Sequence, residues 1–263
     1  MADSTKVIKS VNYNQHAILR DILDLHCGGA ATFDCDITVS KGNFYGHFKR
    51  TIQEKQEDGC IIEKQEEFEI PLPKYKFDVE PQIEGCEKID PWGPIPLEDN
   101  SLDSICVDLP FVISPMNCPS LQEENNNCLI ARRFSGYYPR YQLFDSYEHW
   151  LKECYRVLKP GGILVWKSQA TVSGSIQLMT PYYSCRVAED LGFYILDEFI
   201  CLSKMRMHSS KIKKQQHARK YHSYFHVFQK DNPKKDKIGY WVRDYEYKNK
   251  EKEIKTPTVK VDE

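Results

Sequence analysis

Four aspartates each stand at the end of a short segment whose composition favours a β-strand. The segments are residues 31–36, 75–78, 86–90 and 102–108, and they end on Asp36, Asp78, Asp90 and Asp108. In an open α/β sheet, ligands bind outside the carboxyl ends of the strands. We therefore expect these carboxylates, which accept hydrogen bonds, to gather on one rim of a sheet beside a ligand.

Asp108 is followed by Leu109, Pro110 and Phe111, so a carboxylate, a turn and an aromatic ring follow one another at a strand end. Asp108 ends the segment LDSICVD, residues 102–108. This segment predicts a strand more strongly than residues 75–78 and 86–90 do, because it is longer and more apolar. The same pattern also occurs where a strand simply ends in a turn.

Residues 125–144 interleave arginines with aromatic rings, a combination that suits contact with phosphates and stacking on bases. Arg132, Arg133 and Tyr137 are the candidates in this stretch for binding a nucleic-acid substrate. The alternative is an aromatic-rich lid that packs on its own domain.

The net charge of −2 conceals an asymmetry between two parts of the chain. Residues 203–263 carry +9 and the first 202 residues carry −11. Residues 203–230 contain eight Lys or Arg, four His and no Asp or Glu, and such a stretch can bind a phosphate backbone. His217 and Arg219 are its candidates for that contact, and a solvated charged surface is the alternative.

The length of 263 residues is compatible with one large α/β domain that buries a sizeable core. Ten cysteines occur without a Cys-x-x-Cys pair or a Cys/His cluster at zinc spacing. We therefore expect reduced thiols in a cytoplasmic protein, and no metal site. The acidic, polar start does not predict a signal peptide, and no apolar run is long enough to predict a membrane span.

Three segments predict the helices that would position these residues. Residues 13–25 have apolar side chains at helical spacing. A second helix is predicted to begin at Asp145, with Glu148 completing a capping box, and to stop at residues 159–162, Lys-Pro-Gly-Gly. A third is predicted over residues 180–192, with proline in its first turn and glycine at its end.

Strands alternate with these helices, which argues for a mostly parallel sheet with helices on both faces. Further strands are predicted at residues 163–166, 193–202 and 221–228. The last two have no helical pattern between them, and we expect them to form an antiparallel pair at one edge of the sheet. The acid-rich residues 53–69 are expected to be an exposed excursion.

Several segments together resemble the motifs of Class I S-adenosylmethionine-dependent methyltransferases. Residues 147–169, YEHWLKECYRVLKPGGILVWKSQ, resemble a helix that ends in R-x-L-K-P-G-G and feeds the fifth strand. Residues 108–111, DLPF, resemble the Asp-Pro-Pro-Tyr/Phe signature of the amino-methyltransferases, with Leu109 in place of the first proline. Residues 33–45 and 221–230 resemble the first motif and the closing strand of phage and bacterial DNA methylases.

The resemblance covers about residues 13–230. It implies a Rossmann-like methyltransferase domain over residues 1–230 and a charged tail over residues 231–263, expected to be partly disordered. It also implies methyl transfer from S-adenosylmethionine to the exocyclic amino group of a DNA base, at adenine N6 or cytosine N4. Asp108 would accept an N–H of that amine, Pro110 would shape the site, and Phe111 would stack on the extruded base.

The same resemblance assigns a cofactor site by position. Lys41 and Gly42 would form the turn near the methionine end of S-adenosylmethionine, since glycine lets the backbone approach closely. The remaining assignments are Asp34 or Asp36 for the ammonium group, Asp78 for the ribose hydroxyls and Asp90 for the adenine amino group. The family's usual Gly-x-Gly is absent, and each acid has the alternative of a helix cap or a solvated turn.

Lys167 and Gln169 end the strand expected beside Asp108 and are candidates for contact with the substrate, although a polar strand end is equally ordinary. Two other functions stay open. An RNA base methyltransferase would carry the same motifs. A catalytically silent methyltransferase-like domain that only binds nucleic acid would account for Leu109 and the divergent glycine loop.

Overall fold

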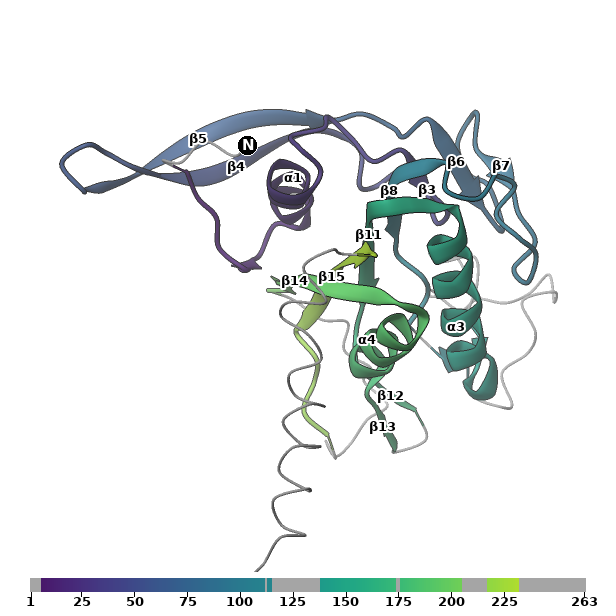
Figure 1. Cartoon of the computed structure of the whole chain (residues 1–263). Coiled ribbons are helices and arrows are strands. Elements are labelled where there is room, and N and C mark those ends of the chain that lie inside the picture. The colour runs from purple at the N-terminus through teal and green to yellow at the C-terminus, as the bar shows by residue number, and fades with distance from the viewer. Residues whose placement is uncertain (1–5, 112, 115–137, 174–175, 205–216, 232–263) are drawn as a thin grey trace, which may run out of the picture.

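An eight-stranded sheet forms the centre of the computed structural model, which describes residues 6–111, 113–114, 138–173, 176–204 and 217–231 (Figure 1). Across the sheet, the strands are Val11–Asn12 (β2), Phe193–Leu202 (β14), His222–Lys230 (β15), Leu158–Ser168 (β11), Leu102–Val107 (β8), Cys35–Asp36 (β3), Tyr75–Asp78 (β6) and Glu87–Lys88 (β7). Every neighbouring pair is parallel except those of β15, which runs antiparallel to both β11 and β14. The prediction of a mostly parallel α/β sheet is therefore confirmed.

The antiparallel pair β14–β15 is not at the edge of the sheet, contrary to the sequence prediction. β2 adds to the outer side of β14 in parallel, with Val11 opposite Ile200 and Asn12 opposite Cys201. Two residues are too few to show the alternation of apolar and polar side chains by which a strand is predicted. A strand as short as β2 is therefore not recognisable in the sequence.

Helices cover both faces of the sheet, as predicted. On one face, α3 (Arg140–Val157) and α4 (Thr180–Leu191) share a core with Ile105 and Val107 of β8. On the other face, α1 (Gln15–His26) shares a core with Cys106. Successive side chains of a strand point to opposite faces, so β8 contributes to both halves of the core.

The ends of α1 and α4 follow signals in the sequence. Asn14 caps α1, and its side chain accepts the backbone N–H groups of His16 and Ala17 at 3.0 and 3.4 Å. α4 has proline in its first turn and ends at Gly192, whose φ of +109° is left-handed. A Cβ at Gly192 would lie 2.8 Å from the Tyr155 hydroxyl, so both conformation and space require glycine.

α3 begins at Arg140, before the predicted capping box, so the prediction that Asp145 caps this helix is wrong. Asp145 lies inside the helix and is exposed. Leu143, in the additional turn, is fully buried in the core on this face of the sheet. Most helical stability in proteins comes from packing of an apolar face, and here that packing outweighs the local preference of Asp145.

A β-hairpin, rather than a helix, connects β3 to β6. It consists of β4 (Gly46–Lys55) and β5 (Ile61–Ile70), extends away from the central sheet in Figure 1, and pairs with β1 (Lys6–Val7). Arg50 of β4 is 4% exposed and forms ion pairs with two aspartates of α1 and with Glu66 of β5. The predicted acid-rich excursion, residues 53–69, thus comprises the end of β4, the turn and nearly all of β5, and it is mostly exposed.

Two short pairs complete the strands of the described chain. They are β9 (Ile113–Ser114) with β10 (Tyr138–Pro139), and β12 (Thr171–Ser173) with β13 (Ile176–Leu178). The eight cysteines in the described ranges are free thiols. No helix within those ranges is long and apolar enough to span a membrane. The predicted tail lies, from residue 232 onward, outside the described residues.

Candidate active site

The carboxyl ends of β3 and β8 lie side by side, and hydrogen bonds join their aspartates. The Asp36 carboxylate accepts the Tyr45 hydroxyl at 2.6 Å, and the Thr38 backbone N–H and hydroxyl at 2.7 and 2.9 Å. Thr38 Oγ1 in turn accepts the backbone N–H of Asp108 at 2.8 Å. These bonds fix the first residue after β8 relative to the end of β3.

Asp36 is only 1% exposed. Burial raises the pKa of its carboxyl to about 7; the hydrogen bonds from Tyr45 and Thr38 lower this pKa, and the nearby Asp108 raises it. The charged form of Asp36 is therefore costly in this structure. A cationic ligand group beside it would offset that cost.

Asp108 forms an ion pair with Lys167, the residue that follows Trp166 in β11. Trp166 pairs with Val107 of β8 in parallel register, so residues 167 and 108 come after a matched pair. Lys167 Nζ lies 2.8 Å from Asp108 Oδ2 and 3.4 Å from Gln15 Oε1. The lysine and aspartate side chains are 13% and 25% exposed, so the charge-assisted bond between them orients the Asp108 carboxylate with limited screening by water.

The three residues after Asp108 have different surroundings. Leu109 is 4% exposed and belongs to the core on the α3–α4 face of the sheet. Pro110 and Phe111 are half-buried, and Phe111 borders a pocket. Leu109, at the position of proline in the signature, is therefore a packed core residue in this chain.

The turn after β3 is tied to the end of β6. Gly42 has a φ of +70°, and its backbone N–H donates to the Val39 carbonyl at 2.7 Å. The Ser40 backbone N–H donates to Asp78 Oδ2 at 2.8 Å, and burial raises the pKa of Asp78. Lys41 is exposed in the same turn. The predicted turn and the acid of β6 thus share the rim that carries Asp36.

The other two acids predicted for the cofactor differ from these. Asp90, after β7, is exposed, and its Oδ1 accepts the backbone N–H two residues further on at 2.8 Å. Asp34 Oδ2 accepts the backbone N–H groups of Asp103 and Ser104 at 2.8 and 3.0 Å, at the start of β8. The Asp34 carboxylate therefore serves the amino end of β8, which favours Asp36 over Asp34 as the partner of the ammonium group.

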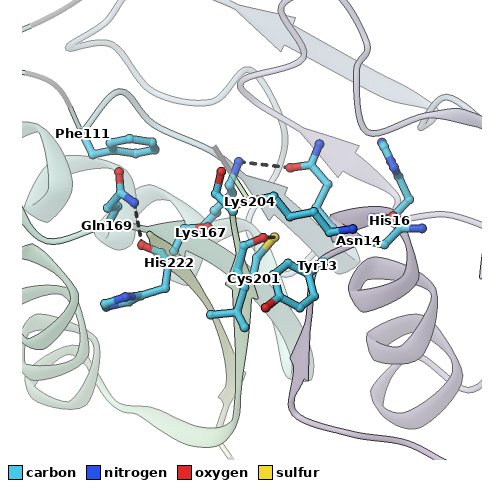
Figure 2. A pocket seen from close by; sticks show the side chains of 13 residues that line it. Tyr13, Asn14, His16, Phe111, Lys167, Gln169, Cys201, Lys204 and His222 are labelled. Carbon is cyan, nitrogen blue, oxygen red and sulfur yellow. Dashed lines mark hydrogen bonds between the residues drawn. The ribbon is translucent and has the colours of Figure 1, made fainter. Parts of the chain in front are cut away.

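A pocket of about 940 Å³ opens beside Lys167 (Figure 2). Its walls come from the segment that starts α1, the segment after β8, the end of β11, the end of β14 and the start of β15. The lining residues are Tyr13, Asn14, Gln15, His16, Phe111, Lys167, Gln169, Cys201, Leu202, Ser203, Lys204, His222 and Ser223. Phe111, Lys167 and Gln169 are expected near a substrate from the sequence. Ser203, Lys204, His222 and Ser223 belong to the basic residues 203–230 that are expected to bind phosphate. The remaining lining residues gave no signal of a shared site, because their segments are far apart in the chain.

Two other predicted substrate contacts fall within the described residues and do not line this pocket. His217 and Arg219 are half-buried just before β15. Arg132, Arg133 and Tyr137 lie outside the described residues. Across the ranges that the structure describes, no group of three or more His, Cys, Asp or Glu is arranged to hold a metal ion.

Residues 102–263 match a family model for DNA methylases. This match begins at β8, spans more than half of the chain and contains Asp108. The chain belongs to this DNA methylase family. No curated protein matched it in a sequence comparison.

Among solved structures, the chain is similar to a candidate DNA modification methylase from Thermus thermophilus, at 16% identity over 52% of this chain and 49% of that one, with a TM-score of 0.34. The S-adenosyl-L-methionine complex of that protein gives 15% identity over 52% and 51%, with a TM-score of 0.35. A SAM-dependent methyltransferase from Thermotoga maritima, a candidate histamine N-methyltransferase, gives 13% over 84% and 94%, with a TM-score of 0.32. The chain spans about half the length of the Thermus protein. Membership of the DNA methylase family rests on the family model alone.

Proposed function

We propose that the chain transfers the methyl group of S-adenosylmethionine to the exocyclic amino group of a DNA base, at adenine N6 or cytosine N4. The observation that carries this proposal is the position of Asp108, Pro110 and Phe111 at the carboxyl end of β8, inside the segment that matches the DNA methylase family. Ligands of open α/β sheets bind at this end of the strands.

An exocyclic amine conjugated to a base ring is a weak nucleophile, so its placement and hydrogen bonds decide whether it reacts. The Asp108 carboxylate would accept an N–H of the amine and direct the nitrogen lone pair toward the methyl group. Lys167, whose Nζ is 2.8 Å from Asp108 Oδ2, would keep that carboxylate in its orientation. Phe111 would stack on the base.

When bound, S-adenosylmethionine would supply an electrophilic methyl group on its sulfonium. The rim residues fit this molecule. Asp36 is a buried carboxyl with a pKa raised to about 7, which suits the ammonium group of the methionine part. The Asp78 carboxylate accepts two backbone N–H groups and has further lone pairs that can accept ribose hydroxyls. Lys41, Gly42 and Asp90 are further candidates on the same rim, and the φ of +70° at Gly42 suits glycine in the turn after β3.

Two alternatives carry different expectations. An RNA base is an alternative substrate, because its amino groups would meet the same residues. A catalytically silent domain that only binds nucleic acid is favoured by one observation, the burial of Leu109 in the core where the signature has proline. Calorimetric titration with S-adenosylmethionine separates this alternative, because a silent domain should bind the cofactor poorly or not at all.

Nucleoside mass spectrometry tests the proposal, after incubation of the protein with labelled S-adenosylmethionine and a mixture of DNA and RNA. The label is expected in N6-methyladenine or N4-methylcytosine from DNA. Label found only in RNA supports the first alternative, and no label at all supports the second.

Asp108→Ala is expected to abolish the label. Asp103→Ala is the matched control, because Asp103 is an exposed aspartate at the other end of the same strand, paired with Lys159 at 2.7 Å. Full activity in Asp108→Ala would contradict the proposed role of the rim.

A further inference from the structure

Among the described residues, the lining of the pocket beside Lys167 contains basic side chains and no acidic one. Of its thirteen lining residues, all within the described part of the chain, two are lysines, two are histidines and none is Asp or Glu (Figure 2). Asp108 lies 2.8 Å from Lys167 and pairs with its charge, so Lys204 is the lysine of this lining that can attract an anion. The ligand of this pocket is therefore expected to carry negative charge.

The pocket also lies where the most basic part of the sequence leaves and rejoins the sheet. Ser203 and Lys204 enter it directly after β14, and His222 and Ser223 return to it at the start of β15. Residues 203–230, which these four residues belong to, hold eight Lys or Arg and no carboxylate. Of these eight residues, Lys204 lines the pocket, and it is the last described residue before the basic stretch continues.

Tyr13 adds an open aromatic surface to the same pocket. Its side chain is 60% exposed, and Lys204 Nζ lies 5.5 Å from the centroid of its ring. An exposed ring next to an ammonium group suits a base stacked beside its own phosphate. A volume of about 940 Å³ is at the upper end of the range for ligand pockets, so a nucleotide fits within it.

We propose that this pocket binds a nucleotide of the substrate strand that flanks the methylated base, with Lys204 on its phosphate and Tyr13 stacked on its base. This inference rests on the proposed function, because Phe111, which lines the same pocket, would mark the methylated base. Lys167 connects the two sites, since it lines the pocket and its Nζ pairs with Asp108 at 2.8 Å. The pocket would place the strand so that the target base reaches Asp108.

Fluorescence anisotropy with a labelled oligonucleotide, at a series of salt concentrations and without cofactor, tests this site. Lys204→Ala is expected to flatten the slope of log K against log salt by about 0.7–0.9, the contribution of one phosphate contact. Lys88→Ala is the matched control and should keep the wild-type slope, because Lys88 is an exposed lysine of β7 at the opposite edge of the sheet.

The aromatic contact has a different signature. Tyr13→Ala is expected to lower the affinity about tenfold without changing the salt slope, because stacking on a base involves no counterion release. Tyr13→Phe keeps the ring and should bind like the wild type. A loss of affinity in Tyr13→Phe equal to that in Tyr13→Ala would contradict stacking.

The outcomes separate this inference from the proposed function. An unchanged salt slope in Lys204→Ala contradicts nucleotide binding in this pocket. Loss of S-adenosylmethionine binding in that variant also contradicts it, because the pocket would then belong to the cofactor. Another outcome is that the wild type and Lys204→Ala differ in salt slope as expected although the wild type transfers no methyl group. That result supports the nucleotide site and contradicts the proposed function. If the wild type binds no nucleic acid, both fall.

Discussion

The two ends of the neighbouring strands β3 and β8 carry the same acidic residue type in different surroundings. At the amino end of β8, Asp103 forms an ion pair with Lys159 in which the aspartate is 73% exposed. At the carboxyl end, Asp108 forms an ion pair with Lys167 in which the aspartate is 25% exposed. An exposed pair contributes little, whereas a partly buried pair interacts more strongly because water screens it less.

The second acid at each end shows the same contrast. Asp34 accepts two backbone N–H groups at the start of β8 and so completes the hydrogen bonding of that strand. Asp36 is 1% exposed and has a pKa of about 7. One end of the sheet uses aspartate to complete the fold. The other end holds aspartates in surroundings that make their charged form costly without a ligand, as functional sites often do.

The largest expected effect distinguishes the two ion pairs by their chemistry. Asp108→Ala should lower single-turnover methyl transfer by about 10³-fold or more, since positioning a weak nucleophile can contribute about 7–11 kcal/mol. Its affinity for S-adenosylmethionine, measured by calorimetry, should stay close to wild type. Asp108→Asn should be less damaging, because the amide oxygen still accepts a hydrogen bond. Equal losses in Asp103→Ala and Asp108→Ala would remove the contrast between the two ends.

The next effect concerns Asp36 and the pH dependence of stability. Its pKa of about 7 in the folded protein lies above the ordinary value of 3.8, so the folded state binds the proton more tightly than the unfolded chain. The contribution of Asp36 protonation to the free energy of unfolding is fully present below pH 3.8 and is lost as the pH rises through about 7. The loss is at most about 4 kcal/mol.

Asp36→Asn should remove most of this pH dependence, because the amide does not titrate while its oxygen still accepts the hydrogen bond from Tyr45. Urea unfolding of both proteins at about pH 5 and about pH 8 measures the difference. The raised pKa of Asp36 would be refuted if the wild type were as stable or more stable at the higher pH and Asp36→Asn showed the same trend.

A smaller pair of effects separates ligand binding from stability. Asp78→Ala should weaken S-adenosylmethionine binding by about 1–3 kcal/mol, the usual cost of leaving polar partners unpaired. Asp34→Ala should leave that affinity unchanged and lower the free energy of unfolding by about 1–3 kcal/mol, because two backbone N–H groups of β8 lose their acceptor. Calorimetry and urea unfolding of both variants check this division. Weaker cofactor binding in Asp34→Ala would indicate that Asp34 contacts the cofactor.

The smallest expected effect is that of the exposed ion pair. Asp103→Ala should change the free energy of unfolding by about 0.2–1 kcal/mol, because water and salt screen its pair with Lys159. Urea unfolding at low and high salt measures it, and the difference from wild type should shrink at high salt. A change as large as that of Asp34→Ala would mean that exposure does not separate the two ends.

Much of the fold could be predicted because its signals are local. Pro181 and Gly192 mark the two ends of α4, and the apolar spacing of α1 is visible within a few turns. The start of α3 could not be predicted, because burial of Leu143 against distant strands decides it. β2 could not be predicted either, since its pairing with β14 joins residues at opposite ends of the chain.

The sequence by itself determined that an aspartate, a proline and an aromatic ring follow a hydrophobic strand, and that positive charge collects after residue 203. Only the tertiary structure decided which acids share the rim. Asp34 precedes the short strand β3 and Asp36 ends it, and the pairing of that strand with β8 sends one carboxylate to each end. The pocket beside Lys167 likewise exists only once separate segments meet. The physical reason is that strand register, burial and hydrogen bonding at this site join residues about seventy positions apart, which no local pattern encodes.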